Sequence, residues 1–453
     1  MTTLLALPDR AGRDSFWLAL ILILYLLIGG LYAVRTPDWQ NPDEPAHYNY
    51  IAQVAVGGCC PVIAAGDWDQ EYLDLIKQER FAPETLGALD SVEYEDHQPP
   101  LYYLMAAPVY SLTNGSLNAL RLFSVLIGAA VIMCAYGIGR TLLPDQPQIA
   151  LGAAALTAFV PQHAAVLASV NNDGLAELIV AMSLLGLILY LKEVPVRVWM
   201  LGLLAGIGAL TKASTLFLFG LIPLMLLLDA WFKRRQRVPL RLIRLLAAFF
   251  VPALALAALW WLRNLYVYGW PDFLGLGAHD SVVIGQLRTA DLIAEVGLGE
   301  YLRRALETTF NSFWGQFGWM AAPLPAWAYT LIAGLLGVVI GGWLVDLLVL
   351  RRRAPTVRPF WRSLAWLAIG LTLLLGLLQY LYYNTEFVQF QGRYLYPALI
   401  PCALWLVQGL DAWRRLAAPG QRWGRALLVA LPVLLLLPIN IFALWRILPG
   451  LAS

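Results

Sequence analysis

Charged residues are scarce in this chain of 453 residues, because Asp, Glu, Lys and Arg together make up only 13% of it. A soluble domain has about 25% charged and about 45–50% apolar residues. Here the apolar fraction is 60% and the mean hydropathy is +0.66, which excludes a large soluble protein. The composition therefore predicts a multi-pass membrane protein, and a net charge of +2 gives no sign of a nucleic-acid partner.

The sequence indicates neither a cysteine-based metal site nor a common nucleotide-binding site. The four cysteines have no metal-binding spacing: Cys134 and Cys402 fall in apolar runs, while Cys59 and Cys60 are adjacent in a loop. Neither a Walker-type loop nor a G-x-G-x-x-G motif stands at the start of an expected helix, which argues against the common nucleotide-binding folds.

Apolar runs long enough to cross a bilayer recur along the chain and predict an all-α polytopic fold of about eleven transmembrane helices in a single domain, 1–453. The first span is read as a retained helix rather than a signal peptide. The fifth and sixth spans are short and meet at Thr211-Lys212, which indicates a tight hairpin. The run 101–112 follows Pro99-Pro100, is too short to cross, and is expected at the membrane interface. The spans are expected at 15–34, 119–141, 149–169, 174–191, 198–211, 213–231, 244–266, 326–350, 361–383, 394–413 and 425–447.

The distribution of Lys and Arg tests this count. With the N-terminus inside, the inner segments hold 20 of the 31 basic residues, as the positive-inside rule requires of a plasma (inner) membrane protein. Clusters at 233–235, 351–353 and 414–415 then share the cytoplasmic side, and two large loops, 35–118 and 268–324, face outward. The inner segments are 1–14, 140–148, 192–197, 231–244, 351–362 and 414–425.

The second outer loop has two recognisable patterns. Residues 291–306 have the amphipathic spacing of a helix lying on the membrane. An aromatic run from Phe310 to Trp319 is typical of an interfacial belt.

Residues 41–48, with the sequence NPDEPAHY, form the most informative stretch of the first outer loop. Pro45 suits the first turn of a helix, so we expect Asp43 and Glu44 on a turn that opens a helix running to about Val56. Two carboxylates with His47 beside them suit acid–base chemistry or a metal. The alternative is an N-cap followed by solvated acids.

Other polar residues gather at the outer ends of the predicted spans, where burial in lipid is costly. His97 and Gln98 precede the interfacial run, and Asn172 and Asp173 open the fourth span. An N-cap explains one Asn or Asp there, and a local hydrogen bond explains each histidine. The run Asn171-Asn172-Asp173 exceeds what one cap requires, which favours a site.

Three cations lie on the side where the positive-inside rule predicts few: Lys212, Arg263 and Arg393. Snorkelling to lipid phosphates accounts for one such residue. Three of them beside an acidic loop favour a phosphate clamp, because Arg binds phosphate through two parallel hydrogen bonds and Lys acts as a point charge.

These residues resemble the GT-C superfamily of glycosyltransferases, which use polyprenyl-phosphate sugars. The nearest branch is a bacterial group related to protein O-mannosyltransferases and lipid A aminoarabinose transferases. The resemblance spans nearly the whole chain. The motifs that carry it are PDEPAHY at 42–48, HQPPLYY at 97–103, LRL at 120–122, ND at 172–173, LTK at 210–212, WLRN at 261–264 and QGRYLYP at 391–397.

The resemblance implies an extracytoplasmic active site with an acid in the first outer loop and a second acid in the next. Asp43 matches the general base of an inverting transfer to an acceptor hydroxyl, and Asp173 matches the second acid, with Glu44 orienting Asp43. The donor phosphate is expected on the three cations. Substrate contacts are expected from His47, His97, Gln98, Asn172 and Tyr394.

Several alternatives stay open at this point. Some relatives bind a divalent metal and others do not; its candidate ligands here are Asp43, Glu44, His47 and Asp173. Pro45-Ala46-His47 departs from the mannosyltransferase pattern, which leaves the acceptor open between a protein, a lipid and a glycan. A transporter or flippase for a lipid-linked glycan is the main rival, although no pair of matching halves with broken helices is visible.

Overall fold

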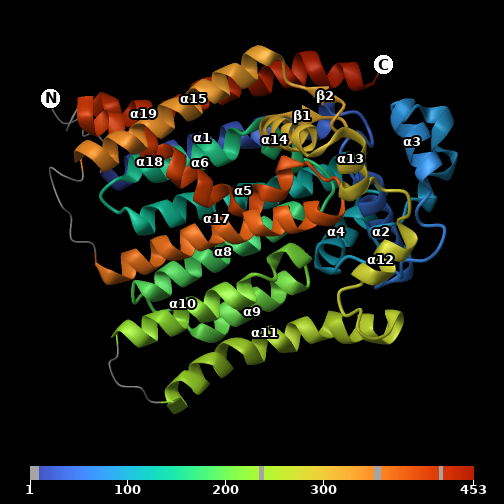
Figure 1. Cartoon of the computed structure of the whole chain (residues 1–453), viewed down its shortest axis with the longest axis horizontal. Helices are drawn as coiled ribbons and strands as arrows, with labels where there is room; N and C mark the ends of the chain where they lie inside the picture. The colour runs from blue at the N-terminus through green and yellow to red at the C-terminus, as the bar shows by residue number, and fades with distance from the viewer. Residues whose placement is uncertain (1–9, 234–238, 351–358, 418–421, 453) are drawn as a thin grey trace, which may run out of the picture.

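The structure is a computed structural model, and it describes residues 10–233, 239–350, 359–417 and 422–452. Long helices lie side by side in one bundle (Figure 1). The principal ones are α1 (Arg10–Arg35), α5 (Leu117–Leu142), α8 (Asp173–Leu191), α10 (Leu218–Lys233), α11 (Pro239–Tyr268), α15 (Ala326–Val345), α17 (Phe360–Glu386), α18 (Leu399–Ala417) and α19 (Arg422–Phe442).

All eleven predicted spans are helical, and within the described residues nine helices are long and apolar enough to cross a membrane. The other two are α6 (Pro147–Phe159) and α9 (Val198–Ala209). The third predicted span is wrong in its length, because Pro161 cannot continue the hydrogen bonding of α6 and starts a separate short helix, α7 (Pro161–Val166). The expected hairpin at Thr211-Lys212 is confirmed: Lys212 is extended (φ −163°, ψ 142°) between α9 and η2 (Ala213–Thr215).

The most buried helices occupy the middle of the bundle. From Gln148 to Phe159 every residue of α6 is buried, as expected of a helix that is apolar all round. It packs against α5, α18 and α19. Small residues let other helices approach closely: a Cβ on Gly342 of α15 would lie 1.9 Å from the carbonyl oxygen of Gly409 in α18.

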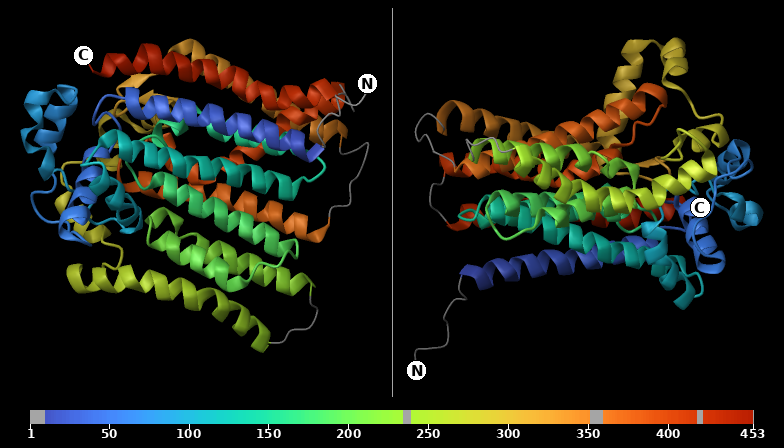
Figure 2. Two further views of the ribbon diagram at one scale, coloured as in Figure 1. Left: turned by 180° about the vertical axis from the view of Figure 1, so that it is seen from behind. Right: turned by 90° about the horizontal axis from the view of Figure 1, so that it is seen from below.

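Both large loops lie at one end of this bundle, called here the loop end (Figures 1 and 2). The first loop folds into short helices, and the expected helix at 45–56 and the non-crossing helix at 101–112 are both confirmed. Adjacent Cys59 and Cys60 form a disulfide within it. Its elements are α2 (Glu44–Gly57), α3 (Gln70–Gln78), η1 (Pro83–Ser91) and α4 (Leu101–Leu112).

The second loop contains α12 (Leu276–Val282), α13 (Thr289–Val296), α14 (Leu298–Trp314) and a hairpin of β1 (Gln316–Phe317) with β2 (Ala322–Pro323). The amphipathic stretch at 291–306 is helical, but Gly297 (φ 81°) divides it. The predicted aromatic belt is wrong in part: Trp314 and Phe317 are buried in the protein, so they face no lipid.

Two of the three basic clusters, 233–235 and 351–353, fall wholly or partly outside the residues that the structure describes. The third is at the last turn of α18, where Arg414 and Arg415 both bind Asp411. Arg415 also binds Asp346 of η3 (Asp346–Leu350). These pairs lie at the end of α18 opposite η4 (Gly392–Ala398), which precedes it at the loop end. Which side of the membrane the loop end faces stays a prediction.

A fully buried ion pair fixes the first loop to the bundle. Arg121 of α5 binds both carboxylate oxygens of Glu44, at 2.9 Å and 2.6 Å, and both side chains are completely buried. Its remaining N–H groups donate to the carbonyls of Ala33, Thr36 and Pro37. Glu44 also accepts from the backbone N–H of Val170 at 3.1 Å. The end of α1, the start of α2 and the turn before α8 are thereby held together.

Replacing one member of this pair should destabilise the fold strongly. We expect Arg121→Met to lower the free energy of unfolding by about 3–5 kcal/mol, because Glu44 would stay buried without a partner. The double variant Arg121→Met/Glu44→Gln should recover part of the loss. Unfolding in detergent, with Arg140→Met at the far end of α5 as control, measures both; equal stability of Arg121→Met and wild type would contradict the prediction.

Candidate active site at the loop end

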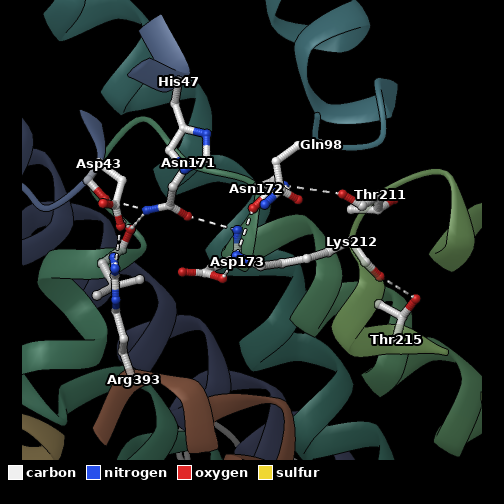
Figure 3. Close-up of polar contacts among 12 residues, drawn as sticks. Asp43, His47, Gln98, Asn171, Asn172, Asp173, Thr211, Lys212, Thr215 and Arg393 are labelled. Atoms are coloured by element: carbon white, nitrogen blue, oxygen red, sulfur yellow. Dashed lines mark hydrogen bonds and ion pairs between the residues drawn. The ribbon is translucent and has the colours of Figure 1, made fainter. Parts of the chain in front are cut away.

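Asp43 lies on a left-handed turn (φ 65°) at the start of α2, and its side chain caps nothing. One carboxylate oxygen accepts a hydrogen bond from the Tyr94 hydroxyl at 2.9 Å, and the other is paired with the guanidinium of Arg393. A non-glycine residue in this conformation is uncommon, although Asp tolerates it better than most residues. Asp43 thus occupies the N-cap position of α2 without a capping hydrogen bond from its side chain, which points toward Arg393 (Figure 3).

The electrostatic surroundings keep Asp43 ionised. Burial alone would raise its pKa, but the charges of Arg393 and His47 and the hydrogen bonds from Arg393 and Tyr94 lower the pKa of Asp43 to about 2. For His47, burial is the largest effect and lowers the pKa of the imidazole. At neutral pH the carboxylate is therefore charged and the imidazole is neutral.

The turn before α8 positions Lys212 from the neighbouring hairpin. The ammonium of Lys212 donates to Asp173 at 2.5 Å and to the side-chain oxygen of Asn172 at 2.9 Å. Asn172 is fully buried, and its amide donates to the carbonyl of Thr211 at 3.3 Å and to Gln98 at 3.2 Å. The side chains of Asn172 and Asp173 thus hold a cation, and Asn172 makes no capping hydrogen bond (Figure 3).

Two cavities meet at Tyr394. The larger, of about 380 Å³, is lined by segments from both large loops and from the end of α17. The smaller, of about 40 Å³, lies between helices. Its polar lining includes Asp173, Lys212 and Arg393. The larger cavity is lined by Pro42, Asp43, Trp68, Gln70, Lys77, Tyr94, Glu95, His279, Gly285, Gln286, Leu287, Trp319, Met320, Tyr383, Val388, Gln389, Gln391 and Tyr394.

Not every predicted site residue lies on these cavities. Glu44 is occupied by Arg121, as described above, and cannot reach the larger cavity as a second acid. Arg263 is separated from the other two cations: it lines neither cavity, and its guanidinium binds the carbonyls of Cys60 and Pro61. Of the three predicted cations, Lys212 and Arg393 therefore line the smaller cavity together and Arg263 does not.

Three further predicted residues, His47, His97 and Gln98, lie outside the linings of both cavities. His47 is buried and hydrogen-bonded to the Tyr103 hydroxyl at 2.8 Å. His97 is buried against His279, with ring centroids 4.3 Å apart, and burial with that neighbour lowers its pKa to about 3. Gln98 contacts Asn172 but lines neither cavity.

The four predicted metal ligands do not converge on one point. Asp43 is bound by Arg393, Glu44 by Arg121, Asp173 by Lys212 and His47 by Tyr103. Three of these partners are cations, which repel a divalent ion placed between them. The donor set around Asp43 therefore does not fit a metal.

Several site residues escaped the sequence reasoning. Arg121 gave a signal, because a lone arginine in an apolar span needs a partner. No sequence pattern placed the other four residues at the site, because separate segments must fold together before they line the larger cavity. They are Tyr94, Glu95, Tyr383 and Trp319, the last of which the sequence assigned to the interfacial belt.

Three comparisons with known proteins bear on this arrangement. The profile of a family described as dolichyl-phosphate-mannose-protein mannosyltransferase matches residues 97–263, a little over a third of the chain. That segment includes Asp173 and Lys212 but neither Asp43 nor Arg393. A sequence comparison with curated proteins gives no match.

Among solved structures, ArnT from Cupriavidus metallidurans in the apo state is similar, with a TM-score of 0.50 and 15% identity over 98% of this chain and 74% of that one. This chain has the GT-C fold. The same protein bound to undecaprenyl phosphate is similar with a TM-score of 0.48, at the same identity and coverage. The fold expected from the GT-C resemblance is confirmed, and the chain is a multi-pass membrane protein.

The lowered pKa of Asp43 predicts that the free energy of unfolding depends on pH. Because the folded-state pKa of about 2 lies below the ordinary 3.8, the ionised carboxylate stabilises the GT-C fold above pH 4, and this contribution is lost as pH falls toward 2. The difference in unfolding free energy between wild type and Asp43→Asn should shrink over that range. Denaturant unfolding in detergent measures it, with exposed Asp38→Asn as the matched loss of a carboxylate; a difference independent of pH would contradict the assignment.

Proposed function

We propose that this GT-C protein is a glycosyltransferase that moves a sugar from a polyprenyl-phosphate donor to an acceptor hydroxyl, with Asp43 as general base. The observation that carries the proposal is the grouping of Asp43 with Arg393 and of Asp173 with Lys212 around two cavities that share Tyr394. The positive-inside bias of the sequence supports a loop end on the extracytoplasmic side of a bacterial inner membrane.

In this proposal the donor phosphate lies on Lys212 and Arg393. Both cations border the smaller cavity, which lies among apolar spans where a polyprenyl tail would be accommodated. In the structure their charges are neutralised by Asp173 and Asp43. A phosphate bearing negative charge competes with these carboxylates, and preorganised cations stabilise it further as it leaves.

The donor phosphate and Asp43 compete for Arg393, so donor binding changes the basicity of Asp43. Asp43 is a weak base while Arg393 and Tyr94 bind its oxygens. When Arg393 turns to the donor phosphate, burial dominates and the pKa of Asp43 rises. The carboxylate then has a free lone pair and greater basicity only after the donor has bound, which protects the donor from premature attack.

The reaction is a single displacement. The acceptor oxygen forms a bond to the anomeric carbon, its proton passes to Asp43, and the bond from that carbon to the phosphate oxygen breaks. Polyprenyl phosphate leaves with the bonding electron pair, so the anomeric centre inverts. The chain holds Asp173 beside Lys212, which gives that acid a positioning role rather than a place in proton transfer.

The larger cavity is suited to the acceptor. Its wall combines five aromatic side chains with a larger number of polar and charged ones, so it offers both ring faces and hydrogen-bonding groups to a molecule that carries hydroxyls. Asp43 and Glu95 reach it from one loop, and Tyr383 and Tyr394 reach it from the region of α17 and η4. The transfer assay below, run with different donors and acceptors, identifies the sugar and the acceptor.

Asp43→Asn should abolish transfer, with a loss of about 10²–10⁴-fold if its role is general-base catalysis. Transfer of radiolabelled sugar from a polyprenyl-phosphate donor, assayed in detergent, measures it. Asp38→Asn is the control. Retained transfer by Asp43→Asn would remove Asp43 from the role, and movement of intact donor between leaflets without transfer would favour the flippase.

Arg393→Met and Lys212→Met should each weaken donor binding roughly 10–100-fold, because each removes a charge-assisted hydrogen bond to phosphate. Arg263→Met should leave donor affinity unchanged, since its partners are loop carbonyls. Titration of polyprenyl phosphate into each purified variant tests this. An equal loss from Arg263→Met would restore the clamp of three cations.

A further inference from the structure

A second group of acids lies in the first loop, apart from the proposed transfer chemistry. Within the described residues, ligand atoms of Asp67, Glu93 and Asp96 all lie within 4.8 Å of one another. They come from two segments: Asp67 lies in the loop before α3, and Glu93 and Asp96 lie in the turn before α4. A hydrogen bond from Glu93 N–H to the Asp67 carbonyl at 3.1 Å ties the two segments together, and one from Asp96 N–H to the Glu93 carbonyl at 3.0 Å closes the turn within the second.

Asp96 gives the independent sign that a ligand is missing from this group. It is only 1% exposed, and its Oδ1 atom has no hydrogen-bond partner. The Oδ2 atom accepts from the Gln53 amide at 2.9 Å, so only one oxygen is satisfied. A buried carboxylate oxygen without a partner is costly, and native proteins pair such groups with a donor or a cation.

No positive side chain compensates these acids in the part of the chain that the structure describes. None of the three acids forms an ion pair with Lys or Arg there. Asp67 accepts a hydrogen bond from the Ala64 N–H at 2.7 Å, and Asp96 accepts the one from Gln53. The Glu93 carboxylate accepts none among the described residues. Three carboxylates held this close repel one another. The arrangement therefore lacks a positive charge at its centre.

We propose that Asp67, Glu93 and Asp96 bind a divalent cation of the calcium type. Ca²⁺ is held by carboxylate oxygens at about 2.3–2.6 Å, so two ligands on opposite sides of the ion are about 4.6–5.2 Å apart. The upper limit of 4.8 Å on the distances between the three ligand atoms is compatible with such an ion. Soft ligands are missing from the three-residue group, which disfavours zinc.

The position of the site gives the cation a structural consequence. Trp68 follows Asp67 and Tyr94 follows Glu93, and both aromatics line the larger cavity. Their rings are in edge contact, with centroids 5.0 Å apart. Tyr94 is also the residue that donates to Asp43. A cation on the two preceding acids would fix this wall of the cavity in place.

The test uses the full-length protein in detergent after chelation, with Tb³⁺ as a luminescent substitute for Ca²⁺ and Trp68 as a neighbouring sensitiser. We expect saturable Tb³⁺ luminescence that Ca²⁺ displaces, with a dissociation constant of about 10⁻⁴–10⁻³ M for Ca²⁺, as in extracellular sites. Asp96→Asn and Glu93→Gln should each weaken binding roughly tenfold or more. Glu71→Gln, an exposed acid of the same loop, is the matched control and should bind as wild type does.

Thermal unfolding gives a second readout that needs no sugar donor. Ca²⁺ should raise the Tm of wild type and of Glu71→Gln but not that of Asp96→Asn, and without Ca²⁺ the neutral isostere Asp96→Asn should be at least as stable as wild type. Folded wild type without saturable binding, or binding that is unchanged in Asp96→Asn, would overturn the proposal. Neither result depends on whether the protein transfers sugar.

Discussion

The buried pair of Arg121 and Glu44 is the constraint on which the rest of the loop end depends. It joins α5 to the first turn of α2, and through Val170 it also reaches the turn that carries Asn172 and Asp173. Because both charges are fully buried, neither can relax toward water if the geometry changes. The left-handed turn at Asp43 is adjacent to this anchor, so its position follows from a charge pair that takes no part in the proposed chemistry.

Charge balance stabilises the group of charged side chains around the two cavities. Asp43 is paired with Arg393 and Asp173 with Lys212, so two carboxylates and two cations neutralise one another near the apolar spans. The same pairing makes the site responsive, since a bound phosphate would replace the carboxylates as the partner of the cations. Without Asp43 and Asp173, the buried charges of Arg393 and Lys212 would have no carboxylate partner and would destabilise the fold. The proposed reaction would also lack its base.

Periodicity and hydropathy predict most of this fold, because each apolar span is a local property of the sequence. The start of α2 was also predictable, since Pro45 marks it. The role of Glu44 was not: adjacent acids look equivalent in sequence, and only the position of Arg121 on a packed helix separates the acid buried in an ion pair from the acid that lines a cavity. The separation of Arg263 from the other two cations could not be predicted either, because its guanidinium binds the backbone carbonyls of Cys60 and Pro61, which no side-chain pattern reveals.

The two acidic groups of the first loop illustrate how surroundings divide the work of one residue type. Asp43 lies beside a guanidinium, which lowers its pKa to about 2, whereas burial and the neighbouring acids raise the pKa of Asp96 to about 8. The first carboxylate is already neutralised by a side chain that a phosphate can draw away. The second has only the Gln53 amide as a partner. The same residue type is thus paired with a cation in one place and left with an unpartnered buried oxygen in the other.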